Sequence, residues 1–386
     1  MVKLILLGLL AGAFFSSTFI LNEVMSAAGG HWFWSASMRY VFMWVIVTAL
    51  IVMQHGFGRI KELTTIFFQY WGFWCITGSI GFGIFYTGIC YAADHVAGWV
   101  VAATFMFTVV TSLLVLLAFG QRFDKKFIVY ALLVFIGVVM VNVSEGMHAA
   151  SVLDANAAPM KDMLLYGALP ALVAAFSYPI GNQLVWQVSY NTRKRRADSL
   201  PTEEGTIQTN EINEKTNALI TEAPVLPADI DHVSDAAKTA NINLSNPNHS
   251  TPPSFLQSLI ARIPAIETNL LQNAFNKVWL MTLGSLPFWL VLGLVVRPDM
   301  PDTSQLFNTL LVALLAGVGA TSIFLYAREK AETSSEVAGV DATQASEVIF
   351  ALIGGMLLLN NAMPPAMGLL GIGLIIIGLI LFAKDG

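Results

Sequence analysis

Ten long apolar runs are the feature that most constrains what this chain can fold into. They lie near residues 4–22, 36–54, 70–92, 97–119, 127–143, 163–186, 277–296, 306–327, 338–359 and 366–383. A helix needs about 20 apolar residues to cross a bilayer core of about 30 Å. The composition agrees, because 56% of the residues are apolar and only 12% are charged, against about 45–50% and about 25% in soluble domains. We therefore predict an all-α integral membrane protein with ten transmembrane helices.

The distribution of Lys and Arg predicts the orientation of these spans. If the N-terminus is cytoplasmic, the short cytoplasmic segments contain fourteen of the twenty basic residues, and the outer side contains only Arg39, Lys161 and Arg297. Short loops rich in Lys and Arg stay in the cytoplasm, so both termini are predicted there, which agrees with an even number of spans. The N-terminal apolar run continues to residue 21. We interpret it as a spanning helix rather than a cleaved signal peptide.

The segment 191–276 differs in kind from the rest of the chain. It is polar and rich in Pro, Asn and Thr, and it begins close to the basic cluster Arg193–Arg196. Such a composition cannot bury enough apolar surface to fold alone, so we predict a long, mostly disordered cytoplasmic loop. Near its end, apolar residues recur at helical spacing over 255–263. That pattern predicts a short helix on the inner membrane surface, with a weakly structured tether as the alternative.

The two halves of the chain resemble each other. His95-Val96-Ala97-Gly98 and Glu336-Val337-Ala338-Gly339 open two spans 241 residues apart, and the same offset joins Phe135-Ile136-Gly137 to Ile376-Ile377-Gly378. Each half holds five spans, so the second copy would be inverted in the membrane, as in many secondary transporters. We predict repeats formed by 1–143 and by 163–190 together with 277–386. In such folds the substrate site lies near the membrane midplane, where the repeats meet.

Four segments carry a family resemblance. They are SSTFILNEVMSAAGGHWFWSASMRY (16–40), GFGIFYTGICYAADHVAGWVVAAT (81–104), YPIGNQLVW (178–186) and VAGVDATQASEVIFALIGG (337–355). Together with the 5+5 pattern, they resemble the multidrug resistance efflux transporter branch of the drug/metabolite transporter superfamily. The resemblance implies a ten-helix exporter whose central cavity is lined mainly by spans 1, 3, 4, 6, 8 and 9. Two departures from it are the long loop and Phe105-Met106, where a more polar pair is expected.

The ninth span contains an unusual polar stretch, VDATQASEVI (340–349). Asp341, Gln344 and Glu347 share one face of a helix. If that helix starts near 338, Glu347 lies about 14 Å along it, close to the middle of the bilayer. A charge there costs on the order of 2.5–3.5 kcal/mol, and burial favours the protonated form of a carboxyl. Glu347 is therefore our first candidate for a proton-coupling acid. The alternative is that Thr343, Gln344 and Ser346 hold it and it only joins helices.

Further candidates lie on the proposed cavity helices. Glu23 and Asp341 are additional proton-coupling candidates, although Asp341 could simply sit at the cytoplasmic interface near a helix N-terminus. The substrate-cavity candidates are polar or aromatic residues, namely Asn22, Tyr91, Trp99, Tyr178, Asn182, Gln183, Tyr326, Thr343 and Gln344. The aromatic faces among them can bind cations, with packing or interfacial duty as the alternative. No Lys or Arg is assigned to the middle of a span, which disfavours anionic substrates.

These residues predict a secondary active transporter. We expect proton-coupled efflux of amphipathic cationic or drug-like molecules, with export of a metabolite such as an amino acid as the alternative. A receptor or scaffold is the rival from another class. The sequence contains no HExxH, GxSxG or GxxxxGK[ST] motif, which disfavours an enzyme and excludes transport by this chain's own ATPase.

The expected partners follow from this interpretation. They are a small-molecule substrate, protons and the lipid bilayer of a bacterial cytoplasmic (inner) membrane, without nucleic acid, and a homodimer is left open. Cys75 and Cys90 lie on one predicted helix, about 22 Å apart at 1.5 Å per residue. They can therefore form neither a disulfide nor a metal clip, and no metal or cofactor is expected.

Overall fold

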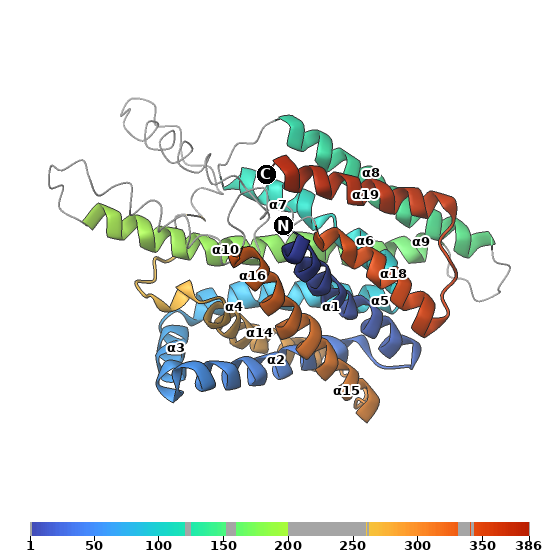
Figure 1. The fold of residues 1–386 in the computed structure, drawn as a ribbon. Coiled ribbons are helices and arrows are strands. Elements are labelled where there is room, and N and C mark those ends of the chain that lie inside the picture. Colours follow the sequence, from blue (N-terminus) through green and yellow to red (C-terminus); the bar gives the residue numbers. More distant parts are fainter. Residues whose placement is uncertain are drawn as a thin grey trace.

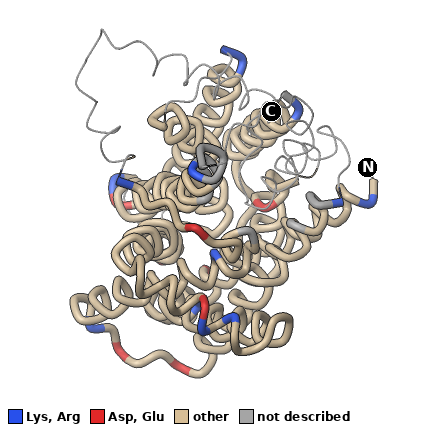
Figure 2. The backbone as a smooth tube through the Cα atoms, turned by 90° about the vertical axis from the view of Figure 1, so that its left-hand side faces the viewer, with Lys and Arg blue, Asp and Glu red and all other residues tan. Residues whose placement is uncertain are grey.

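The computed structural model describes residues 2–119, 125–151, 160–199, 260, 262–330, 340 and 343–385. Throughout these ranges the regular elements are helices, as predicted (Figure 1). Nine stretches are long and apolar enough to cross a membrane. They are Val2–Ala27, Trp32–His55, Trp71–Ala93, Gly98–Ala118, Lys125–Met147, Met160–Val188, Ala274–Val296, Thr303–Phe324 and Ala366–Lys384. Figure 2 shows how few charged residues interrupt this framework.

The tenth predicted span, 338–359, is only partly described. Its described portion, Thr343–Leu359, is a shorter apolar helix. It consists of the 3-10 turn η5 (Thr343–Ala345) and α18 (Ser346–Leu359). Ten spans and cytoplasmic termini therefore stay predictions.

Five of the described spans are continuous α-helices, and the others are composite. The uninterrupted ones are α1 (Val2–Ala27), α2 (Trp32–His55), α14 (Ala274–Val296) and α19 (Ala366–Asp385), and α8 (Lys125–Ser151) is likewise unbroken. The fourth span breaks at Met106 and Phe107, between α6 (Gly98–Phe105) and α7 (Thr108–Ala118). This break coincides with Phe105-Met106, the pair that departs from the family pattern.

Three composite spans contain a π-helical segment. The first consists of α4 (Trp71–Gly78), the π-helical η1 (Ser79–Ile84) and α5 (Phe85–Ala93). The second consists of α9 (Met160–Asp162), the π-helical η2 (Met163–Ala168) and α10 (Leu169–Ser199). The third consists of α15 (Thr303–Val312), the π-helical η4 (Ala313–Ala320) and α16 (Thr321–Glu329). Both η1 and η4 contain a Gly-x-Gly triplet, Gly81–Gly83 and Gly317–Gly319, at an offset of 236 residues. The widened turns therefore occur in the third and eighth spans, which correspond in the predicted repeat.

Helices of one predicted half pack against helices of the other. α1 lies against η4, α16 and α18, whereas α10 lies against η1, α5 and α7. α2 packs on α14, and α8 and α19 run side by side (Figure 1). Close approach depends on small residues, because Gly81 faces Gly181 and Gly137 faces Gly371. The two predicted halves are therefore packed together along several helices, and the repeat itself stays a prediction.

A short helix not expected from the sequence lies at one end of the bundle. α3 (Phe57–Gln69) crosses that end in Figure 1. It buries Leu63 and Phe67, which are spaced by four residues, while Lys61 and Glu62 remain exposed. This apolar spacing is that of an amphipathic helix. A search for apolar runs does not detect α3, because the segment is too polar to be a span.

The predicted loop has defined structure at both flanks. α10 continues to Ser199, and the segment 262–273 packs back against it. Asn191 Nδ2 donates to the Ile263 carbonyl at 3.1 Å, and Thr192 Oγ1 donates to the Ile266 carbonyl at 2.9 Å. Ile266 is buried in the core beside α10 and α14. The middle of the loop, with most of the predicted helix 255–263, lies outside the described residues.

Candidate functional site

Glu347 lies in the first turn of α18 and is only 8% exposed. α18 and η5 run parallel to α1, because Gly8 and Gly12 lie against Thr343 and Ser346. Gly12 is about 15 Å from the start of α1, and the whole helix is about 39 Å long at 1.5 Å per residue. The carboxyl of Glu347 is therefore at a level near the middle of α1, although α18 itself begins later than the sequence suggested.

The carboxylate of Glu347 makes no hydrogen bond or ion pair with any residue that the structure describes. The hydroxyls on the same segment are used elsewhere: Thr343 Oγ1 donates to the Val340 carbonyl at 2.5 Å, and Ser346 Oγ donates to the Thr343 carbonyl at 2.5 Å. Thr343 is buried, whereas Gln344 is half-buried. The alternative interpretation required these neighbours to hold the carboxylate of Glu347. Thr343 and Ser346 do not, because their hydroxyls donate to backbone carbonyls.

Aromatic rings from four other helices converge near this acid. Tyr178 on α10 interacts electrostatically with Glu347. Its ring centroid is 5.1 Å from that of Phe85 and 5.8 Å from that of Phe105, and Phe105 lies 6.3 Å from Phe19 on α1. One charged group thus borders an aromatic cluster, which is the environment expected for an amphipathic cation.

Two amides of α10 extend this neighbourhood. Asn182 is half-buried and interacts with the Tyr178 side chain one turn earlier. Gln183 is buried, and its Nε2 has no partner in the described part of the chain. Both residues were predicted as cavity candidates.

Arg39 corrects a prediction made from the sequence. It was counted on the outer side, yet it lies seven residues into α2, about 10 Å along the helix, and its side chain is 8% exposed. Its guanidinium carbon is 4.1 Å from the centroid of the Tyr86 ring, and its Nη1 donates to Thr18 Oγ1 at 3.4 Å. Arg39 is thus a buried cation inside a span, although it lies short of the middle of α2. The prediction that no Lys or Arg occupies the middle of a span, and the argument against anionic substrates based on it, do not take this buried cation into account.

Asn22 belongs to the Arg39 cluster. This buried side chain on α1 donates from Nδ2 to the Tyr86 hydroxyl at 3.1 Å, and its Oδ1 has no partner among the described residues. Tyr178 interacts electrostatically with Arg39 as well as with Glu347. The predicted residues Asn22, Tyr178 and Glu347 therefore belong to one neighbourhood, which also contains Arg39.

Glu23 has a different environment. Its Oε2 accepts from the Gly98 backbone amide at 2.6 Å, and its Oε1 accepts from Asn361 Nδ2 at 2.6 Å. The first bond places a negative charge at the N-terminus of α6, where the helix dipole favours it. Glu23 is thus held between α1, α6 and the segment that follows α18.

The remaining candidates are not gathered at Glu347. Trp99 is buried in α6. Tyr91 is half-buried, with its ring centroid 5.5 Å from that of Trp32 and 4.7 Å from that of His95. Tyr326 is 48% exposed and lies beside Lys330. Asp341 lies outside the described residues.

A separate polar group surrounds the turn after α5. Asp94 interacts with the Ser26 side chain and with the nearby His31 and His95 rings, and burial raises the pKa of its carboxyl. Within the described ranges, no group of three or more His, Cys, Asp or Glu residues could hold a metal ion.

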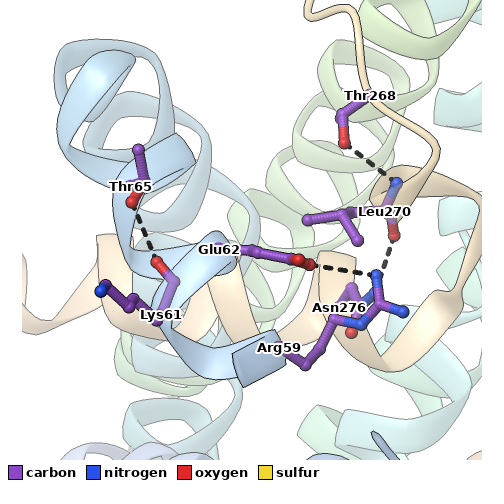
Figure 3. Close-up of polar contacts among 7 residues, drawn as sticks. All are labelled: Arg59, Lys61, Glu62, Thr65, Thr268, Leu270 and Asn276. Atoms are coloured by element: carbon purple, nitrogen blue, oxygen red, sulfur yellow. Dashed lines mark hydrogen bonds and ion pairs between the residues drawn. The ribbon is translucent and has the colours of Figure 1, made fainter. Parts of the chain in front are cut away.

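A cavity of about 690 Å³ lies at the end of the bundle that carries α3. Its walls include Glu62 and Tyr70 on one side and Arg195 and Glu267 on the other. Figure 3 shows part of this region, where Glu62 pairs with Arg59 at 3.4 Å and Asn276 Nδ2 donates to the Leu270 carbonyl at 2.8 Å. This cavity does not include any residue of the Glu347 neighbourhood.

The fold and the buried charged groups define a multi-pass α-helical membrane protein. Residues 2–385 match the family described as "EmrE: Putative multidrug resistance efflux transporter". The chain belongs to this family of membrane transporters, in agreement with the resemblance seen in the sequence.

Two relatives and one solved structure are similar to the chain. A Bacillus subtilis (strain 168) protein described as "Uncharacterized protein YjlA" is 28% identical, with 98% of this chain and 94% of the relative covered. A Shouchella clausii protein, "Uncharacterized 42.1 kDa protein in intracellular alkaline protease 3'region", is 26% identical over 85% of this chain and 65% of the relative. A solved structure titled "Crystal structure of protein" has a TM-score of 0.50 at 11% identity, covering 99% of this chain and 96% of that chain. That likeness shows a shared fold alone.

Proposed function

We propose that this protein exports a small organic molecule from the cytoplasm in exchange for protons, and that Glu347 carries the exchanged proton. The observation that supports this most is the buried Glu347 carboxyl, which has no hydrogen-bond or ion-pair partner among the described residues. Membership of a transporter family supports transport as the activity.

The physical argument concerns the cost of a charge at this depth. A carboxylate without a partner inside a membrane protein is disfavoured by the loss of water. Binding a proton removes the charge, and binding a cationic group compensates it. One carboxyl can thus take either a proton or a substrate cation in turn. This alternation couples proton movement to substrate movement, because the proton and the substrate each shift the protein toward the conformation that binds them better.

The helix arrangement supports alternating access to such a site. In inverted-repeat transporters, one repeat or bundle moves against the other around a site near the midplane. Here α1 and α10 pack against helices of the opposite predicted half. The π-helical segments η1 and η4 lie in those contacts, and such widened turns are often found at functional sites.

Two substrate classes remain within this proposal. The aromatic rings around Tyr178 favour amphipathic cationic or drug-like molecules. The buried guanidinium of Arg39 favours the second candidate, a metabolite such as an amino acid that also carries an anionic group.

The test is transport in vesicles with an imposed pH gradient, using ethidium for the first class and phenylalanine for the second. We expect gradient-driven movement of at least one compound by the wild type, and its loss in Glu347→Gln. The matched control is Glu62→Gln, the same substitution at an exposed position of α3, which should transport like the wild type. Gradient-driven transport that survives in Glu347→Gln contradicts the role of this acid.

A further inference from the structure

Arg39 is a buried cation that the proposed proton exchange does not use. Its guanidinium contacts Thr18 Oγ1 at 3.4 Å and interacts with the Tyr86 side chain, whereas its Nε is buried without a partner among the described residues. No carboxylate in the described part of the chain pairs with it, and the group that faces it most closely is the ring of Tyr86.

A ring face compensates such a charge only in part. Arginine differs from a simple point charge because its planar guanidinium offers several N–H donors in a fixed fork that matches a carboxylate. A buried arginine whose Nε has no hydrogen-bond partner can therefore bind the anionic group of a ligand. Intramembrane ionisable residues of this kind commonly mark substrate pathways.

Other unused donors lie on the helices around Arg39. Trp289 Nε1 on α14 is buried without a partner in the described ranges, and its ring stacks on Tyr40, the neighbour of Arg39, at a centroid distance of 5.7 Å. The buried Gln183 Nε2 is a third such donor. Among the described residues, Asn22 Oδ1, beside Tyr86, is a buried acceptor without a donor.

The arrangement separates two unlike charges that do not pair with each other. Arg39 lies on α2, which packs against α5 and α1, and Glu347 lies on α18, which packs against α1 and α6. Tyr178 interacts electrostatically with both. A ligand held by Arg39 would need an anionic group and an apolar part against the rings of Tyr86 and Tyr40.

We propose that Arg39, with Tyr86 and Asn22 beside it, binds the carboxylate of the transported molecule. The aromatic rings next to Arg39 favour a carboxylate that also carries an apolar part, such as an aliphatic or aromatic amino acid. This inference rests on the proposed function, because it names the substrate class of the same site.

The rival explanation is structural: Arg39 would only join α1, α2 and α5 through Thr18 and Tyr86. Both explanations predict that replacing Arg39 lowers stability. Only carboxylate binding predicts that Arg39 decides which chemical form of a ligand binds.

The test measures ligand binding to the purified full-length protein at one fixed pH. The probes are leucine, phenylalanine and methionine, each as the free amino acid, as its carboxamide and as its N-acetyl derivative. We expect at least one free amino acid to bind, and to bind at least tenfold more tightly than its carboxamide. In Arg39→Gln that preference should fall to less than about twofold. Arg39→Lys keeps the charge but not the fork, and should retain only part of the preference.

The control is Arg297→Gln, the same substitution at an exposed arginine at the end of α14, which should keep the wild-type preference. Thermal unfolding without ligand shows whether each variant is folded, and Arg39→Lys carries the test if Arg39→Gln is not. Equal binding of acid and carboxamide by the wild type overturns the proposal. An unchanged preference in a folded Arg39 variant, or no binding by any of the probes, also overturns it.

The result of the ligand-binding test can be distinguished from the result of the proton-exchange test. The binding assay uses neither transport nor a pH gradient, and the vesicle assay of Glu347→Gln does not require a preference for carboxylates. If Glu347→Gln abolishes gradient-driven transport while acid and carboxamide bind equally, proton exchange stands and the assignment of a carboxylate to Arg39 falls. The reverse pattern leaves the Arg39 site standing without the coupling role of Glu347.

Discussion

Glu23 and Asn361 are joined by a 2.6 Å hydrogen bond across 338 residues of sequence. The same carboxylate accepts from the Gly98 amide at the start of α6. Glu347, on the helix that precedes Asn361, has no such donor among the described residues. Two acids that the sequence presented as similar candidates therefore differ in kind: Glu23 is held by two donors, and Glu347 is not.

Glu23→Gln should lower stability without removing proton exchange. The amide keeps one acceptor oxygen but loses the charge that strengthens both bonds, so we expect a loss of about 1 kcal/mol in the free energy of unfolding. A thermal unfolding series with Glu23→Gln, Asn361→Ala and the double variant measures the coupling between the two side chains. Loss of gradient-driven transport in Glu23→Gln at unchanged stability would show that Glu23, rather than Glu347, titrates.

The α8–α19 contact should be sensitive to a single methyl group. A Cβ on Gly371 would lie 2.7 Å from the Gly137 carbonyl oxygen, whereas a Cβ on Gly373 would meet nothing within 4 Å. We expect Gly371→Ala to destabilise the protein by about 1–3 kcal/mol through overpacking. Gly373→Ala on the same helix should be neutral or slightly stabilising. Thermal unfolding in matched detergent compares the two, and equal effects would contradict the observed packing of α8 on α19.

Shortening the long loop should leave transport intact. We predict that deletion of residues 200–253 preserves transport, because this segment lies outside every span and the described contacts of the flanks are kept. Those contacts include the hydrogen bonds of Asn191 and Thr192 to the segment 262–273. Vesicle transport of the deletion variant, at matched protein amounts, is the measurement. A variant that inserts normally but no longer transports would indicate a gating or partner role for the loop.

The spans were predictable because their signal is local. Each is an apolar run of sufficient length, and Glu347 stood out because a carboxyl interrupts such a run. α3 was missed because Leu63 and Phe67 are too few to mark a span, although their spacing of four residues indicates one buried helical face. The packing of 262–273 was missed because it depends on Asn191 and Thr192, more than sixty residues earlier.

The burial of Arg39 is the feature of the candidate site that the sequence did not predict. Near the start of an apolar run, an arginine is normally interpreted as an interfacial residue, because its long side chain can reach the membrane surface. Its burial results from the approach of Thr18 on α1 and Tyr86 on α5, which no local pattern encodes. The chemistry of the substrate was therefore less predictable than the fold.

The position of the carboxyl of Glu347, as well as its presence, should control coupling. Glu347→Gln removes a titrating group from a buried site, so insertion and stability should be equal to the wild type or better. Substrate exchange without a gradient can persist in this variant, whereas substrate-driven proton movement should vanish.

Glu347→Asp provides the sharper comparison, because it retains an acid on a side chain one methylene shorter. We expect proton coupling to persist and the pH optimum of transport to shift, since the carboxyl occupies a different position relative to Tyr178 and α1. Transport rates of the wild type, Glu347→Asp and Glu347→Gln are measured across a pH series in vesicles, with Glu62→Asp as the exposed control. A wild-type pH profile in Glu347→Gln would refute the assignment, and Glu23 and then Asp341 would be tested in the same way.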